Sequence, residues 1–575
     1  MKLNKIFIVI LFSTSQLLSQ DIGTTEVRVV EGFKPSIPEA SRLNEKAAFA
    51  DTIKKVRTQE YAVIATDLKS NYKTRPLKAA KVKADKIAQL YGTKVSVGFG
   101  NAWTTKASIV HNSTRSKTIS YGILLNHFAN KYDIISSSST KFSNTAKNSK
   151  NTMHLYGKKI SASHIFMANL DYDRSTANWI EQNPALPEDR RGLVNRFAYT
   201  KLSFSAISKE LAADKLKHHT TFFVADLNEF SENQIHLSTN LSKTIKGLPF
   251  ALEIELNDYL NYNNPDSKFE STNVQSFHFS PSTAITKYGV DFDLGIEFHY
   301  LSDGTPFDIF PQIRATKELV KDVLLVHVGL RHSDQRHTLK SLSDENPYIH
   351  SYGTDQTIFS GNAILQNLKR TDSDELYVAM RNVLAEDEVF EGSVAYGMVG
   401  NFAHFVRDYN LNYNRFLVDY IDVKQLHINA SYDRKINNII SVKANANYYN
   451  WDKEVYHKPN FTCDISTPVN LRDKIKVIPS VNYKGERVAR QEYSSLIFGD
   501  PIDPDRGFVY PDSGAQHTIA ELPAQFHMNL GVYYNYTQNI SAYLQLNNLT
   551  NSQQDVWIGY REVGFNGLFG LNYSF

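Results

Sequence analysis

The feature that most constrains this chain is a period-two alternation of apolar and polar residues from about residue 92 to its end. Successive side chains of a β-strand point to opposite faces, so such a segment forms a strand with one apolar and one polar face. The best segments run roughly 9–12 residues, which a tilted strand needs to cross a bilayer, whereas soluble strands average about 5–6. The clearest segment alternates Val290, Phe292, Leu294, Ile296, Phe298 and Tyr300 with Asp291, Asp293, Gly295, Glu297 and His299.

The alternation recurs along the whole region, and its pattern indicates a membrane barrel. Acidic, basic and histidine side chains on the polar faces suit a water-filled lumen, and the apolar faces suit lipid. Aromatic residues make up 12% of the chain and gather at strand ends, as in interfacial girdles. We therefore predict an all-β fold, a large transmembrane antiparallel β-barrel of about 22 strands, within a range of about 20–24. A soluble sandwich or β-helix is the alternative. The other segments are 95–99, 119–125, 166–172, 252–256, 324–330, 440–448 and 528–536.

The connections between these segments differ in length. Short turns are predicted at Asn263–Asp266, Ser302–Gly304 and Asp433–Asn438, and long polar loops at 333–356 and 493–521. Membrane barrels have short periplasmic turns at one end and longer extracellular loops at the other, so this asymmetry supports the barrel.

Composition excludes several other classes of protein. Mean hydropathy is −0.38, and no later segment approaches the roughly 20 apolar residues of a spanning helix. The net charge of +3 favours neither nucleic acid nor an acidic partner. Cys463 is the single cysteine, so neither a disulfide framework nor a cysteine-based metal site is expected.

The N-terminal residues 1–20 have the three parts of a secretory signal peptide. Lys2 and Lys5 form a basic start, Ile6–Phe12 is a short apolar core, and Ser13–Gln20 is a more polar exit. We predict export, with a retained anchor as the alternative.

Residues 21–91 form a second region that lacks the barrel pattern, and we predict that it is periplasmic or lumenal, with the barrel over 92–575. Apolar residues recur near helical spacing in Glu39–Val56, which predicts one helix. Lys73–Lys86 is a basic run that either is solvated or meets an acidic surface or lipid headgroups.

The last strand carries a more specific pattern. Its apolar face ends on an aromatic C-terminal residue and alternates with Gly570, Asn572 and Ser574. This resembles the signature by which the barrel-assembly machinery receives its substrates, which implies that machinery and outer-membrane lipid as partners. The signature residues are Phe569, Leu571, Tyr573 and Phe575.

The preceding segments extend the resemblance to a family. Leu544–Asn551 and Trp557–Gly564 look like the end of TonB-dependent receptor barrels. The general character of the sequence, including a signal peptide that ends in Ser-Gln, resembles barrels of the Bacteroidetes group. The resemblance implies a bacterial outer-membrane location. Receptors of this family carry an N-terminal plug domain, but residues 21–91 show no plug motifs. Thr25–Val30 either resembles a TonB box or is an ordinary short strand.

Candidate chemistry is sparse in the sequence. His218 and His219 are adjacent, so on a strand they point to opposite faces. Asp500, Asp503 and Asp505 lie in a proline-rich stretch without the spacing of an EF-hand. We predict a non-enzyme with no catalytic, cofactor-binding or metal-binding residues. The predicted lumen-facing polar residues, whose acidic members are a weaker candidate for cation binding, are Asp291, Asp293, Glu297 and His299.

Two functions remain open. The first is a receptor-like barrel for solute uptake or transport across the outer membrane. The second is a structural or accessory subunit of an outer-membrane complex, with outer-membrane or periplasmic protein partners. A barrel this wide with nothing inside would leak, so loops, residues 21–91 or a partner must block it.

Overall fold

The structure is a computed structural model, and it describes residues 90–134, 144–181, 194–209, 212, 214–227, 232–262, 272–303, 307–349, 368–408, 413–492 and 517–575. Several sequence predictions lie outside these residues. They are the signal peptide, the segment 21–89 with its helix, basic run and plug question, the turn at Asn263–Asp266, and the aspartates at 500, 503 and 505.

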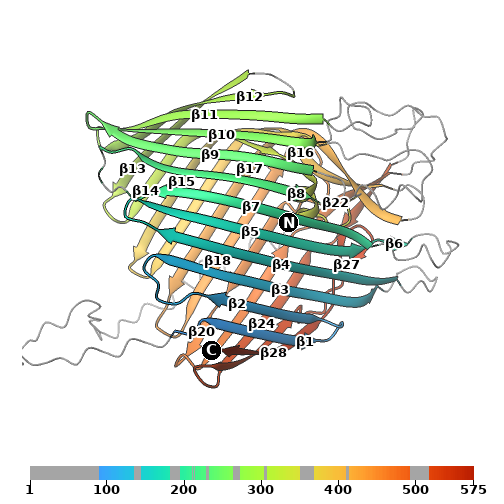
Figure 1. The fold of residues 1–575 in the computed structure, drawn as a ribbon. Helices are drawn as coiled ribbons and strands as arrows, with labels where there is room; N and C mark the ends of the chain where they lie inside the picture. Colours follow the sequence, from blue (N-terminus) through green and yellow to red (C-terminus); the bar gives the residue numbers. More distant parts are fainter. Residues whose placement is uncertain are drawn as a thin grey trace, which may run out of the picture. The chain divides into compact units, whose positions relative to one another are not determined.

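In the described part of the chain, 22 antiparallel strands form one closed barrel, as the alternation predicted (Figure 1). Each strand pairs with the next along the chain, apart from short extra strands in the connections. The first half of the barrel comprises β1 (Thr93–Gly100), β2 (Thr105–Asn112), β3 (Ile119–Ile134), β4 (Asn144–Ile160), β5 (His164–Asn178), β7 (Val194–Ser208), β8 (Lys217–Leu227), β9 (Glu232–Ile245), β10 (Leu248–Tyr262), β11 (Thr272–Lys287) and β12 (Val290–Leu301).

The second half continues the same antiparallel order. It comprises β13 (Phe307–Val320), β14 (Leu324–Arg336), β15 (Arg370–Ala385), β16 (Glu388–Asp408), β17 (Tyr413–Lys435), β18 (Ser441–Trp451), β19 (Phe461–Ser466), β21 (Ile475–Lys484), β24 (Gln525–Asn535), β25 (Ile540–Asn547) and β28 (Asn566–Ser574). The short extra strands are β6 (Ile180–Glu181), β20 (Val469–Leu471), β22 (Arg487–Glu492), β23 (His517–Leu522), β26 (Asp555–Trp557) and β27 (Tyr560–Arg561).

The barrel closes where its first and last strands meet. β1 pairs with β28 so that Val97 lies opposite Leu571 and Phe99 opposite Phe569. Every backbone group of a spanning strand needs a partner inside the bilayer, and closure supplies partners for both edge strands.

The two ends of the barrel differ in the length of their connections, but the β12–β13 connection, predicted as a short turn at Ser302–Gly304, lies at the same end as the long ones. At one end the turns are tight, as in Lys246–Gly247 and Tyr288–Gly289, whose residues all have positive φ between 51° and 85°. Such backbone angles belong to hairpin turns whose twist matches the flanking strands. At the other end lie the long connections, including 337–369 and 548–565. We call these the short-turn end and the long-loop end.

The structure corrects two predicted boundaries. Strands β16 and β17 have 21 and 23 residues, well beyond the predicted length, and β17 runs to Lys435 into the turn expected at Asp433–Asn438. The long loop predicted from residue 333 begins later, because β14 continues to Arg336. A helix follows, α2 (Leu339–Glu345), whose start is fixed by a capping box of Thr338 and Ser341.

One face of most barrel strands carries exposed apolar side chains. On β12, Ile296 is 46% exposed and Phe298 is 37% exposed, whereas Glu297 between them is 6% exposed. No helix among the described residues is long and apolar enough to cross a membrane.

Candidate functional site

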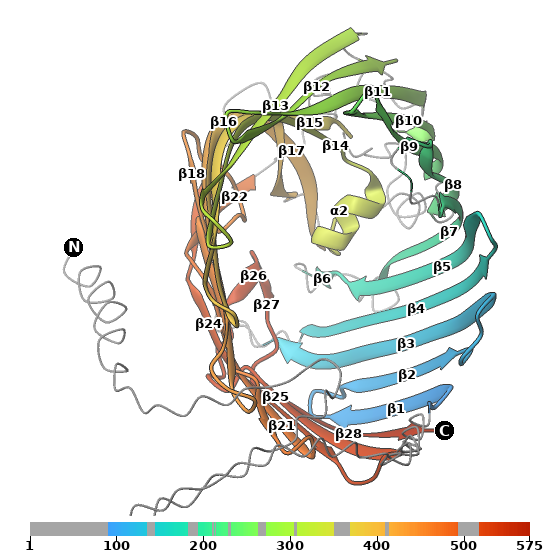
Figure 2. The same cartoon turned by 90° about the vertical axis from the view of Figure 1, so that its left-hand side faces the viewer.

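The long-loop end of the barrel is filled from the inside by two connecting segments. One is 337–349, which contains α2, and the other is 555–561, which contains β26 and β27. Figure 2 shows α2, β26 and β27 within the ring of strands. We call these two segments the mouth cap. Their buried side chains share one hydrophobic cluster with residues of the barrel wall.

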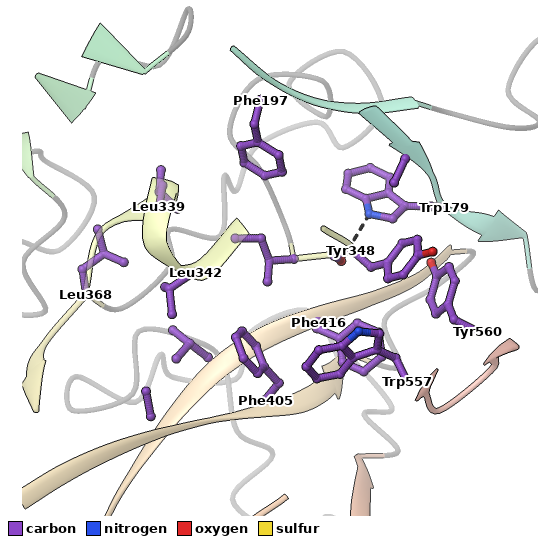
Figure 3. Close-up of a cluster of buried hydrophobic side chains, with 14 of the residues drawn as sticks. Trp179, Phe197, Leu339, Leu342, Tyr348, Leu368, Phe405, Phe416, Trp557 and Tyr560 are labelled. Atoms are coloured by element: carbon purple, nitrogen blue, oxygen red, sulfur yellow. Dashed lines mark hydrogen bonds between the residues drawn. The ribbon is translucent and has the colours of Figure 1, made fainter. Parts of the chain in front are cut away.

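The α2 segment is held by Trp179, which directly follows β5, and by Asn195 of the neighbouring strand β7. The Trp179 indole Nε1 donates a hydrogen bond to the Tyr348 carbonyl oxygen at 3.3 Å (Figure 3). The Asn195 amide Nδ2 donates to the carbonyl oxygens of Pro347 at 2.9 Å and Ile349 at 2.8 Å. Trp179 and Asn195 are 1% and 0% exposed, so these bonds form away from solvent.

Aromatic stacking joins the two segments of the mouth cap. The rings of Tyr348 and Tyr560 stack with centroids 3.6 Å apart. Trp557 contacts Phe405 of β16 at 5.2 Å and Phe416 of β17 at 5.6 Å between ring centroids (Figure 3). Aromatic pairs at these separations stabilise by about 0.5–1.5 kcal/mol beyond the area they bury.

Ionisable groups hold the α2 segment on its polar side, and burial raises the pKa of one of them, Glu232, to about 7. The backbone N–H of Leu339 donates a hydrogen bond to the Glu232 side chain at 2.7 Å. This bond satisfies one of the N–H groups at the start of the helix that have no partner within the helix. Lys340 Nζ lies 3.2 Å from the Asp173 carboxylate of β5.

The hairpin segment of the mouth cap is held by one arginine. Arg487 of β22 donates from its guanidinium to the carbonyl oxygens of Val556 at 2.7 Å and Asp555 at 2.8 Å. The mouth cap is therefore attached to β5, β7, β9, β16, β17 and β22.

One histidine of the mouth cap, His337, and one beside it, His457, are buried in neutral form. Burial lowers the pKa of His337 to about 4, and the nearby Lys458 ammonium acts in the same direction. Burial also lowers the pKa of His457 to about 3, although the hydrogen bond from its Nδ1 to the Phe405 carbonyl opposes the shift. The other ring nitrogen of His457, Nε2, accepts from the backbone N–H of Ile558 at 3.4 Å. Both rings therefore hold their places as neutral groups at pH 7.

The polar residues predicted on β12 do not form one group. Asp291 is exposed and accepts a hydrogen bond from Thr286, whereas Asp293 pairs with Arg314 at 2.6 Å. Glu297 and His299 are buried, with His299 Nε2 at 3.3 Å from Glu297 Oε2. All four lie on the face opposite the exposed apolar row of this strand.

The C-terminal signature residues lie on the exposed face of β28. Phe569, Leu571, Tyr573 and Phe575 are 56%, 47%, 50% and 56% exposed. His218 lies on β8, and its Nε2 is 3.1 Å from His164 Nε2 on β5.

Sequence reasoning missed the mouth cap entirely. Its two segments are held by side chains from distant parts of the chain, and Trp179 is 169 positions from its partner Tyr348. The only local signals are the capping box at Thr338 and the aromatic residues Trp557 and Tyr560, which had been noted for the family resemblance.

Several solved structures with a similar fold are siderophore receptors by their descriptions. The siderophore receptor PirA from Acinetobacter baumannii aligns with a TM-score of 0.58 at 12% identity, over 85% of this chain and 81% of that one. The ferric enterobactin receptor PfeA from Pseudomonas aeruginosa, as a double mutant, aligns at 0.57 with 11% identity, over 84% and 80%. The ferric-catecholate import receptor Fiu from E. coli K12 aligns at 0.54 with 11% identity, over 84% and 82%.

This chain thus has a barrel similar in structure to TonB-dependent outer-membrane receptors, at low sequence identity. No protein-family model and no curated protein matches it. The likeness supports the fold that the C-terminal residues suggested, and the aligned proteins are receptors by their descriptions.

Proposed function

We propose that this protein is an outer-membrane barrel that takes up a solute, and that the mouth cap closes its long-loop end until the solute arrives. The observation that carries the proposal is the mouth cap itself. A barrel of this width needs a barrier, and here two connecting segments are folded inward and held by specific polar contacts rather than by covalent links.

Noncovalent contacts of this kind favour a barrier that can move. The Trp179, Asn195 and Arg487 bonds to backbone carbonyls are each worth about 0.5–3 kcal/mol, so a bound solute that replaces some of them can release the segment. A ligand shifts such an equilibrium only through its different affinity for the closed and open forms.

Several parts of this proposal rest on the family resemblance. The long-loop end would face the outside, the exposed apolar faces would meet outer-membrane lipid, and the C-terminal aromatics would serve the assembly machinery. Fiu is described as a ferric-catecholate import receptor and PirA as a siderophore receptor, and import of a solute is the feature we extend to this chain.

The second candidate is a structural or accessory subunit, for which a permanently closed barrel suffices. Conductance of the purified protein in planar bilayers, beside a pull-down from mild detergent, separates the two. Transport predicts a gated or solute-sensitive pore, whereas a silent barrel recovered with stoichiometric partners would contradict it. Deleting residues 21–90 and repeating the conductance measurement tests whether those residues add a second barrier.

A further inference from the structure

Three side chains with metal-binding atoms meet on adjacent strands of the barrel wall. His278 of β11 lies directly opposite His299 of β12, and their ring centroids are 4.1 Å apart. Glu297 is on the same face of β12, with its Oε2 at 3.3 Å from His299 Nε2 and 3.8 Å from His278 Nε2. Glu297 and His299 are 6% and 4% exposed.

A fourth side chain reaches this group from β14, although β13 lies between. Pairing of β13 with β14 ends at Ile313 and Leu330, whereas pairing of β14 with β15 continues to Arg336. Beyond Leu330, β14 therefore separates from β13, and the His332 ring stacks on Phe310 at 3.5 Å. The His332 ring also meets the His299 ring edge-on at 5.2 Å between centroids.

The hydrogen bonding of His332 leaves one nitrogen ready for a ligand. Its Nδ1 lies 2.8 Å from the Asp374 carboxylate, which fixes the proton on Nδ1 and the lone pair on Nε2. The His332 side chain is 1% exposed, yet its Nε2 has no hydrogen-bond partner among the described residues, and neither has His278 Nε2. A buried polar atom without a partner costs about 1–3 kcal/mol, and two occur in this one group.

We propose that His278, Glu297, His299 and His332 bind one divalent transition-metal ion. Imidazole nitrogen with one carboxylate oxygen is a ligand set that suits Zn²⁺, Ni²⁺ or Cu²⁺. Zinc bound to such ligands at about 2.0–2.2 Å places their atoms roughly 3.4 Å apart, near the two separations to Glu297. The candidate ligand atoms of His278, Glu297 and His299 lie within 4.8 Å of one another, and those of His299, His332 and Asp334 do so as a second set, so His299 is common to both.

The ion would connect the barrel wall to the mouth cap. His278, Glu297 and His299 belong to the wall, whereas His332 belongs to the part of β14 that leads directly into residue 337 of the mouth cap. The ion pair of Arg336 with Asp303 at 2.7 Å holds the same strand end. Metal binding would thus fasten the base of the mouth cap to β11 and β12.

Titration of the full-length protein in detergent, after removal of metal with a chelator, tests the site with Zn²⁺ as the probe. We expect one equivalent bound, at least 10-fold weaker binding in His332→Ala, and loss of binding in His299→Ala. His327→Ala is the matched control, because His327 lies on the same strand as His332 but forms a hydrogen bond with Thr316. The Zn²⁺ affinity of this variant should equal that of the wild type. Wild-type protein that binds no Zn²⁺, or His299→Ala that binds it equally well, would overturn the proposal.

A second measurement does not depend on folding of the variants. Co²⁺ added to the chelator-treated wild type should give the visible absorption of a nitrogen- and oxygen-coordinated ion, and Zn²⁺ should abolish it at one equivalent. Absence of that absorption would also overturn the site. Both measurements report metal binding alone, so their outcome does not depend on whether the protein transports a solute.

Discussion

At the scale of single residues, the structure depends on a few side chains and glycines whose surroundings leave little freedom. Asn195 is fully buried, and its side-chain amide donates hydrogen bonds to the backbone carbonyl oxygens of Pro347 and Ile349. The sequence placed Asn195 only within the barrel region 92–575, because a hydrogen bond across 152 positions leaves no local trace.

Asn195→Ala should loosen the α2 segment, since two buried carbonyl groups lose their donor at a cost of about 1–3 kcal/mol each. Hydrogen exchange of residues 337–349 should rise by at least 10-fold. Asn470→Ala, which removes a bond to Asp473 at the short-turn end, should leave that exchange unchanged. Equal exchange in Asn195→Ala and wild type would show that these bonds do not hold the segment.

Gly397→Ala should weaken the pairing of β15 with β16. An added Cβ would lie 2.0 Å from the backbone oxygen of Asp374, which can move only with its strand. Overpacking of this kind costs about 1–3 kcal/mol, visible as a lower urea midpoint of unfolding. Gly157→Ala is the control, because no atom lies within 4 Å of its added Cβ, and a similar loss there would refute the steric cause.

At the scale of elements, the strands were predictable and the mouth cap was not. Alternation is a property of neighbouring residues, so the sequence of a segment such as Val290–Tyr300 is enough to predict that it forms a strand. Helix α2 has seven residues, too few to show a helical period, and its packing partners lie on other elements. The histidine group is spread over β11, β12 and β14, so no spacing within one segment indicates it, and the sequence predicted no metal site.

The mouth cap should also respond to acid. His337 and His457 have a pKa of about 4 and about 3 in the folded protein, against about 6.5 when exposed. The unfolded form therefore binds more protons below about pH 6.5, so their contribution is complete above that pH and is lost as pH falls toward 4 and then 3.

Protease cleavage within 337–349 should accordingly increase as the pH is lowered from 7 to 4. His337→Gln combined with His457→Gln should flatten this dependence, and any remaining change reports Glu232, whose pKa is raised to about 7 by burial. An unchanged profile in the double variant would assign the acid response to other groups.

At the scale of the whole molecule, the strand number of 22 agrees with the prediction, because alternation and turn spacing together fix how many times the chain crosses. What the sequence left open was the barrier. The width of the barrel follows from its number of strands. The packing inside the long-loop end depends instead on contacts that form only in the closed barrel, such as the stacking of Tyr348 on Tyr560.

The most direct test of the central claim compares wild-type protein with the double variant Trp179→Ala, Tyr560→Ala in planar bilayers. These substitutions remove the indole bond to Tyr348 and the stacking that joins the two segments of the mouth cap. Tyr536→Ala, at an exposed position of the short-turn end, is the control. We predict brief or small conductance for wild type and control, and large, long-lived conductance for the double variant. Equal conductance in all three would contradict the claim that the mouth cap closes this barrel.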